Sequence, residues 1–124
     1  MKLIRIHPFE GVTEWEYNGD WKTLAPALDC DLFDVARFND KGDVVFVDDE
    51  GLLKQPSFFF GIEGYPQPLA GIGLVAGTSE DGETIEPTVS LGWVRANVTF
   101  LVYMGDGLFA PYVPGDTDYD TFED

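Results

Sequence analysis

The stretch LFDVARFNDKGDVVFV, residues 32–47, contains the clearest structural pattern in the sequence. Leu32–Phe38 has the length and composition of a β-strand. Asp43–Val47 is rich in β-branched residues, which are typical of strands. Between them, Asn39–Gly42 combines the residues that favour a turn. The stretch therefore predicts two antiparallel strands joined by a hairpin turn.

A second hairpin is predicted upstream of this stretch. Lys2–His7 and Val12–Tyr17 both show alternation, in which every second residue lies on the same face of a strand. In the first of these strands, Ile4 and Ile6 share one face, and we expect that face to point toward the core. The turn residues around Gly11 separate the two strands, so pairing between them is expected.

Two helices are expected, one between the two predicted hairpins and one near the end of the predicted domain. Asp20 is a suitable N-cap for a helix that Pro26 limits to about two turns. Leu69–Gly77 predicts a turn that leads into a buried strand. Ser90 is a suitable cap for a helix over 91–101, although the same residues also alternate, so the strand interpretation stays open. Together these patterns predict an α+β fold, a mainly antiparallel sheet of about five strands with two helices packed against it.

The length of 124 residues predicts one domain, which we place at residues 1–113, followed by an acidic and flexible tail over 114–124. The first residues show no secretory signal, and no apolar run is long enough to span a membrane. Cys30 is the only cysteine, so an internal disulfide is excluded. These features predict a cytoplasmic location.

The charge is strongly negative, with 23 Asp and Glu against 7 Lys and Arg and a net charge of −16. Direct binding of nucleic acid or of an anionic membrane is therefore not expected. A face that engages a basic protein is one explanation of the acidity, and solubility or adaptation to salt is the other. The carboxylates expected on such a face are Asp29, Asp31, Asp34, Asp48, Asp49 and Glu50.

The aromatic run at residues 58–60 and the glycines that follow it form a second candidate region. Three consecutive phenylalanines cannot all point the same way from one strand, so at least one ring needs another surface, such as a homodimer interface. The spacing of the glycines in 71–77 misses the dinucleotide-binding pattern, which favours a role in backbone geometry and close packing. A ligand pocket or interface here would use Phe58, Phe59, Phe60, Tyr65, Gly71, Gly73 and, as an anion anchor, Arg95.

A catalytic or metal-binding set is not evident in the sequence. His7 is the only histidine, and with a single cysteine it leaves too few ligands for zinc. Carboxylates on both sides of Cys30 are expected to raise its pKa and lower its reactivity. Asp116, Asp118 and Asp120 have the spacing of half a calcium loop without the rest of it. We therefore predict no enzymatic activity, no metal and no cofactor.

The layout resembles a small uncharacterised family that is common in bacteriophages, plasmids and their bacterial hosts. The matching segments are the opening strand ending at Pro8, Val44–Asp48 with Glu50-Gly51, Pro68–Gly71 leading through Val75 to Gly77, and Ser90-Leu91 with Val94, Val98 and Phe100-Leu101. The resemblance implies a mobile-element context, the host cytoplasm and a helix over 91–101, but no activity.

The leading hypothesis is a non-enzymatic accessory protein of a phage or mobile element that binds a host protein with a basic surface. Such a protein would inhibit a defence or DNA-processing enzyme by binding it through an acidic face that resembles DNA. The alternative is a module that binds or sequesters a nucleotide or another small metabolite.

Overall fold

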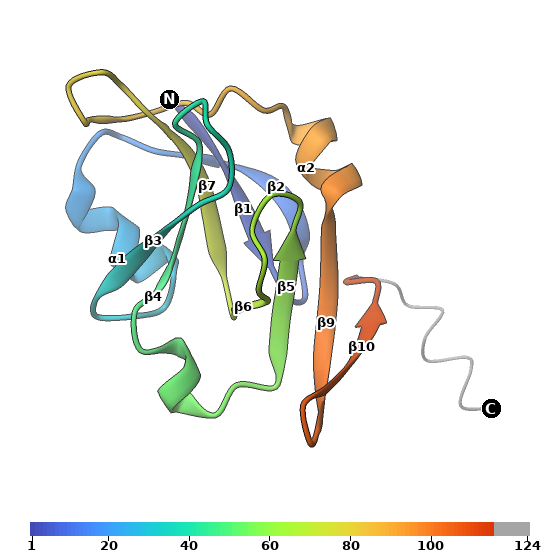
Figure 1. The fold of residues 1–124 in the computed structure, drawn as a ribbon. Coiled ribbons are helices and arrows are strands. Elements are labelled where there is room, and N and C mark those ends of the chain that lie inside the picture. Colours follow the sequence, from blue (N-terminus) through green and yellow to red (C-terminus); the bar gives the residue numbers. More distant parts are fainter. Residues whose placement is uncertain (116–124) are drawn as a thin grey trace.

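The computed structural model describes residues 1–115, which form two antiparallel sheets packed face to face (Figure 1). The first sheet has the strand order β2-β1-β7-β4-β3, with β8 paired to β7, and the second has the order β10-β9-β5-β6. The first sheet consists of β1 (Lys2–His7), β2 (Gly11–Glu16), β3 (Phe33–Arg37), β4 (Val44–Asp48), β7 (Gly73–Thr78) and β8 (Thr84–Ile85). The second consists of β5 (Phe58–Ile62), β6 (Leu69–Ala70), β9 (Val98–Gly105) and β10 (Leu108–Tyr112).

The helical segments are short. The 3-10 turn η1 (Trp21–Thr23) runs into α1 (Leu24–Ala27), a second 3-10 turn, η2 (Gly51–Lys54), follows β4, and α2 (Leu91–Asn97) precedes β9. Asp20 caps the first of these by accepting a hydrogen bond from the Lys22 backbone N–H, as its position predicted.

Both predicted hairpins are confirmed. β1 pairs with β2 from Lys2↔Glu16 to His7↔Gly11, and β3 pairs with β4 from Phe33↔Asp48 to Arg37↔Val44. The mainly antiparallel α+β description fits, but the expectation of one sheet of about five strands is wrong, because the strands divide into sheets of six and four. The second sheet forms because the aromatic run is itself a strand, β5, which pairs with β6 and β9 and not with any strand of the first sheet.

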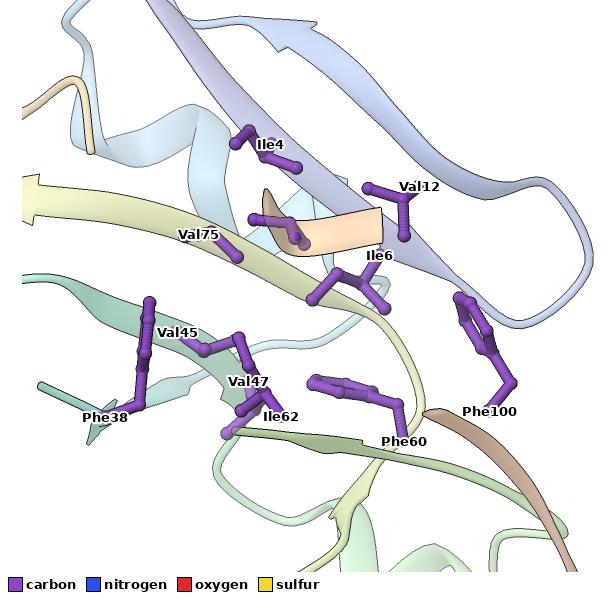
Figure 2. Close-up of a cluster of buried hydrophobic side chains, with 11 residues drawn as sticks. Ile4, Ile6, Val12, Phe38, Val45, Val47, Phe60, Ile62, Val75 and Phe100 are labelled. Carbon is purple, nitrogen blue, oxygen red and sulfur yellow. The ribbon is translucent and has the colours of Figure 1, made fainter. Parts of the chain in front are cut away.

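The first sheet is buried on both faces. One face packs against the second sheet, where Ile4 and Ile6 meet Val45, Val75 and Phe60 (Figure 2). The other face lies under η1 and α1 and forms a second apolar cluster, made of Leu3, Tyr17, Leu24, Leu28, Val44, Phe46, Leu74 and Ala76. The inward position of the two isoleucines is confirmed, and Leu3 on the opposite face is equally buried because the helical segment covers it.

Residues 91–101 contain both structures that their pattern allowed. The helix begins at Leu91, where the Ser90 hydroxyl accepts a hydrogen bond of 3.0 Å from the Trp93 backbone N–H. It ends at Asn97, and β9 starts at Val98 and pairs with β5. The helix expected for 98–101 is therefore wrong, because pairing with a neighbouring strand overrides helical spacing there. Of the expected tail, Asp116–Asp124 lies outside the described residues.

A buried carboxylate joins the β3–β4 turn to the segment before α2. Asp43 is fully buried, and its Oδ2 accepts a hydrogen bond of 2.9 Å from Asn39 Nδ2. The Thr88 backbone N–H donates to Asp43 Oδ1 at 2.9 Å, and the Thr88 hydroxyl donates to Oδ2. Since Thr88 is 45 residues away in sequence, these bonds hold two distant segments together.

We predict that Asp43→Ala lowers the free energy of unfolding by about 3 kcal/mol, because it removes the buried acceptor of three partly buried hydrogen bonds from Asn39 and Thr88. Asp40 lies on the exposed side of the same turn, so Asp40→Ala is a matched control and should change stability by less than about 0.5 kcal/mol. Urea unfolding of both variants measures the difference, and equal effects would contradict the structural role of Asp43.

Candidate functional site

One corner of the molecule gathers most of the predicted carboxylates. The loop after α1 and the segment after β4 meet there, because Phe33 is opposite Asp48 in the β3–β4 register and the Asp49 backbone N–H donates to the Leu32 carbonyl at 3.0 Å. Figure 1 shows η2 directly after the end of β4, on the side where the loop from α1 enters β3. We call this region the acidic corner and define it by Asp29, Asp31, Leu32, Asp48, Asp49, Glu50, Leu52, Leu53 and Lys54.

Asp34, the sixth carboxylate of the predicted face, lies elsewhere. It is opposite Val47 in the β3–β4 register, and cross-strand partners share a face of the sheet. Val47 packs into the core between the two sheets, whereas Asp48 points to the α1 side. Asp34 is therefore on the other face of the edge strand and does not belong to the acidic corner.

The carboxylate of Asp48 is partly neutralised. Its Oδ2 lies 2.6 Å from Lys54 Nζ, and its Oδ1 accepts a hydrogen bond of 2.9 Å from the Glu50 backbone N–H. The hydrogen bond to Asp48 raises the pKa of Lys54, and the Asp31 carboxylate adds to this. Lys54 therefore remains charged and offers its other N–H groups at the corner.

Cys30 lies beside the same groups. Burial raises the pKa of its thiol, and the carboxylates of Asp48, Asp31 and Asp29 raise it further, against the opposing effect of Lys54. The predicted rise in this pKa is confirmed, with burial as the larger cause and the flanking carboxylates as the smaller one. The thiol therefore carries little thiolate at neutral pH.

Exposed leucines lie among the carboxylates. Leu32, Leu52 and Leu53 are 63%, 71% and 79% exposed, respectively. Solvent normally surrounds polar side chains, and contiguous exposed apolar groups with a polar rim are typical of interaction surfaces. Sequence reasoning missed these leucines. One signal for them was present in the sequence. Leu52 and Leu53 directly follow the acidic turn, and neither alternation nor helical spacing in the surrounding residues predicts that these side chains are buried.

A cavity of about 340 Å³ opens beside the acidic corner, between the end of α1, η2 and the start of β7. Asp29, Asp48 and Lys54 reach it from the corner, and His7 reaches it from the end of β1. The remaining lining is mostly apolar and consists of Pro8, Phe9, Leu28, Gly51, Pro56, Ala70, Gly71 and Ile72. Asp29 has a left-handed backbone with φ of 55°, which few residues other than glycine adopt.

The hydrogen bonds of His7, which lines this cavity, fix its neutral tautomer. Its Nδ1 accepts hydrogen bonds of 3.1 Å from the backbone N–H groups of both Phe9 and Glu10, so in the neutral ring the proton is on Nε2. Burial lowers the pKa of His7, Arg5 lowers it further, and Glu10 opposes them. The neutral ring at this position can donate a hydrogen bond through Nε2 but cannot accept a proton there.

The seven residues proposed as a ligand patch are not brought together. Gly71 lines the cavity beside His7, while Tyr65 lines a separate cavity of about 290 Å³. Arg95 borders a groove of about 700 Å³, and two of its nitrogens donate to the Val12 carbonyl at 3.0 and 3.1 Å. The phenylalanines divide, with Phe58 and Phe60 on the side of the first sheet and Phe59 on the opposite face.

Gly73 has a packing role. It is buried, and a Cβ at this position would lie 2.6 Å from Cζ of Phe60 and 2.8 Å from Cγ1 of Val45. The absence of a side chain therefore allows the Phe60 ring to lie against β7. This agrees with the interpretation of the glycine-rich segment as a region of close packing.

Within residues 1–115, no group of three or more His, Cys, Asp or Glu side chains is arranged to hold a metal ion. No helix in the same residues is long and apolar enough to cross a membrane. Comparison with known protein families, curated proteins and solved structures finds no match to this chain.

We predict that His7 titrates below its ordinary pKa of 6.5 in the folded protein. The folded state then binds this proton more weakly than the unfolded state, so the stabilisation is complete above pH 6.5 and is lost as the pH falls toward the folded pKa. NMR titration of the imidazole Cε1–H measures the pKa directly. In parallel, the difference in unfolding free energy between the natural protein and His7→Gln should shrink as the pH falls from neutral to about 5, and a difference independent of pH would contradict the assignment.

Proposed function

We propose that this chain is a non-enzymatic protein-binding module whose acidic corner engages a partner with a basic and apolar surface. The observation that carries the proposal is the set of three exposed leucines among five carboxylates at one corner. Carboxylates alone are explained by solubility, but solubility does not account for leucines at 63–79% exposure beside them.

The two kinds of side chain have different roles in such a complex. Desolvation of the leucines supplies affinity, because burying apolar area is the main favourable contribution to most protein association. The carboxylates speed the encounter with a positively charged partner and disfavour acidic partners. A nucleic-acid enzyme of a host cell has a basic surface of this kind, in agreement with the mobile-element context that the family resemblance implies. Mimicry of DNA explains the carboxylates but gives the leucines no role, so a mixed basic and apolar partner surface fits better.

The cavity beside the corner favours a second candidate function, the binding of a small metabolite. His7 Nε2–H and Lys54 Nζ offer donors, Asp29 offers an acceptor, and the remaining wall is mostly apolar. Such a set suits an amine or amino acid better than a nucleotide, because the surrounding carboxylates repel phosphate groups.

For the protein-binding function, we predict that Leu52→Ser with Leu53→Ser weakens the partner complex at least about tenfold, since burying one exposed leucine side chain contributes about 1.5–3 kcal/mol. Asp49→Asn with Glu50→Gln should slow association and reduce its dependence on salt. Affinity capture from host lysate with quantitative mass spectrometry identifies proteins that both double variants lose, and calorimetry on the purified partner then measures the affinities.

The matched control is Glu80→Gln with Asp81→Asn, which removes two exposed carboxylates from the turn after β7, at the opposite end of the first sheet (Figure 1). It should leave binding unchanged. The proposal is wrong if every captured protein is retained by both corner variants, or if the control variant loses the same proteins.

For the metabolite-binding function, we predict that amines or amino acids raise the melting temperature, because a ligand that binds only the folded state stabilises it. Asp29→Asn should abolish this rise, and asparagine tolerates the left-handed backbone that Asp29 adopts. Asp31→Asn, outside the cavity lining, is the control. Thermal denaturation with a panel of amines, amino acids and nucleotides measures the melting temperature. If no compound of the panel raises it, the metabolite-binding function is excluded.

A further inference from the structure

The outward face of the second sheet has no charged side chain and few of the polar side chains expected on a solvated sheet. Side chains alternate along β5, β9 and β10, so the face away from the first sheet follows from the register. In an antiparallel sheet with one buried face, the residues of the other face are normally polar. Here they are Phe59, Gly61, Thr99, Leu101, Tyr103, Phe109 and Pro111.

Three aromatic rings gather on this face. Phe59 and Phe109 have ring centroids 5.1 Å apart, Tyr103 and Phe109 are 5.3 Å apart, and Phe59 and Tyr103 are 6.3 Å apart. Phe59 is only 8% exposed because the other two rings cover it, whereas Tyr103 and Phe109 are 39% and 37% exposed. Among the elements of residues 1–115, β9 and β10 contact chiefly each other and β5, so no third layer covers the rings.

The distribution of charge indicates which partner suits this face. None of the strands β5, β6, β9 and β10 contains a charged residue, although the whole chain has a net charge of −16. Two copies that met through the acidic corner would bring carboxylates together, at a large electrostatic cost. Two copies that meet through the second sheet desolvate apolar groups and keep the carboxylates apart. For contact between two copies of this chain, the outward face of the second sheet is therefore the surface with the smaller electrostatic repulsion.

The edge strand of the second sheet is poorly suited to pairing with a strand of another copy, so contact between two sheet faces is favoured. β10 is an edge strand and contains Pro111, which has no backbone N–H to donate to a further strand. We propose that the chain forms a homodimer in which the outward faces of the two second sheets pack against each other, with Tyr103 and Phe109 of both copies at the centre. This inference is independent of the proposed function at the acidic corner.

Sedimentation equilibrium of the full chain over a range of concentrations and salt tests the proposal. The dimer should become several-fold tighter as salt rises, because salt screens the repulsion between two acidic copies while leaving apolar contact intact. Binding at the acidic corner has the opposite salt dependence, so failure of one proposal is distinguishable from failure of the other.

Two substitutions locate the interface. Phe109→Asp should raise the dimer Kd at least about 30-fold, and so should Thr99→Glu, which adds a charge to the face without removing a packed ring. Asn18→Asp adds the same charge to the exposed turn after β2 and should leave the Kd within about twofold of the natural value. If circular dichroism shows Phe109→Asp to be unfolded, Thr99→Glu decides. A monomer at all concentrations and salt levels, or a dimer that Thr99→Glu leaves unchanged, would overturn the proposal.

Discussion

The contact of Phe60 with Gly73 and Val45 determines how the two sheets lie on each other. Phe60 is fully buried, and its ring occupies the space that a side chain at position 73 would fill. The second sheet therefore packs directly over β7 and β4, at the centre of the first sheet. Two consequences follow for the surface. Phe59, one residue earlier, must point to the opposite face of the second sheet, and the turn before Gly73 brings Gly71 and Ile72 to the cavity near His7.

The acidic corner and the outward face of the second sheet differ in their physical character. The acidic corner combines strong negative charge with exposed leucines, and the outward face of the second sheet combines aromatic rings with an absence of charge. This separation follows from the sequence, since the strands of the second sheet contain no Asp, Glu, Lys or Arg, whereas carboxylates outnumber basic residues in the segment 29–54 that forms the corner. In a chain organised in this way, the proposed contact with a second copy and the proposed contact with a basic partner use different surfaces, so neither blocks the other.

The chemistry of the single histidine shows why composition alone is a poor guide to activity. His7 lies in a cavity beside Asp29, Asp48 and Lys54, a set of residues that resembles a catalytic group. However, two backbone N–H groups donate to its Nδ1, so the neutral ring offers a donor at Nε2 and no basic nitrogen to the cavity. Burial and the nearby Arg5 lower the pKa of His7, against the opposing effect of Glu10, so the neutral ring is favoured at neutral pH. The hydrogen bonds of the turn, and not the identity of the residue, decide its role.

The sequence by itself determined the local elements of this protein. Turn residues at 39–42, alternation in β1 and β2, and the capping residues Asp20 and Ser90 act over a few positions, so both hairpins and the starts of η1 and α2 were predictable. Only the tertiary structure decided the division into two sheets, the end of α2 at Asn97, the position of Asp34 away from the acidic corner, and the exposure of Leu52 and Leu53. The physical reason is that these features depend on pairing and packing between residues far apart in sequence, and no local pattern specifies which strands meet or which side chains remain without a core to enter.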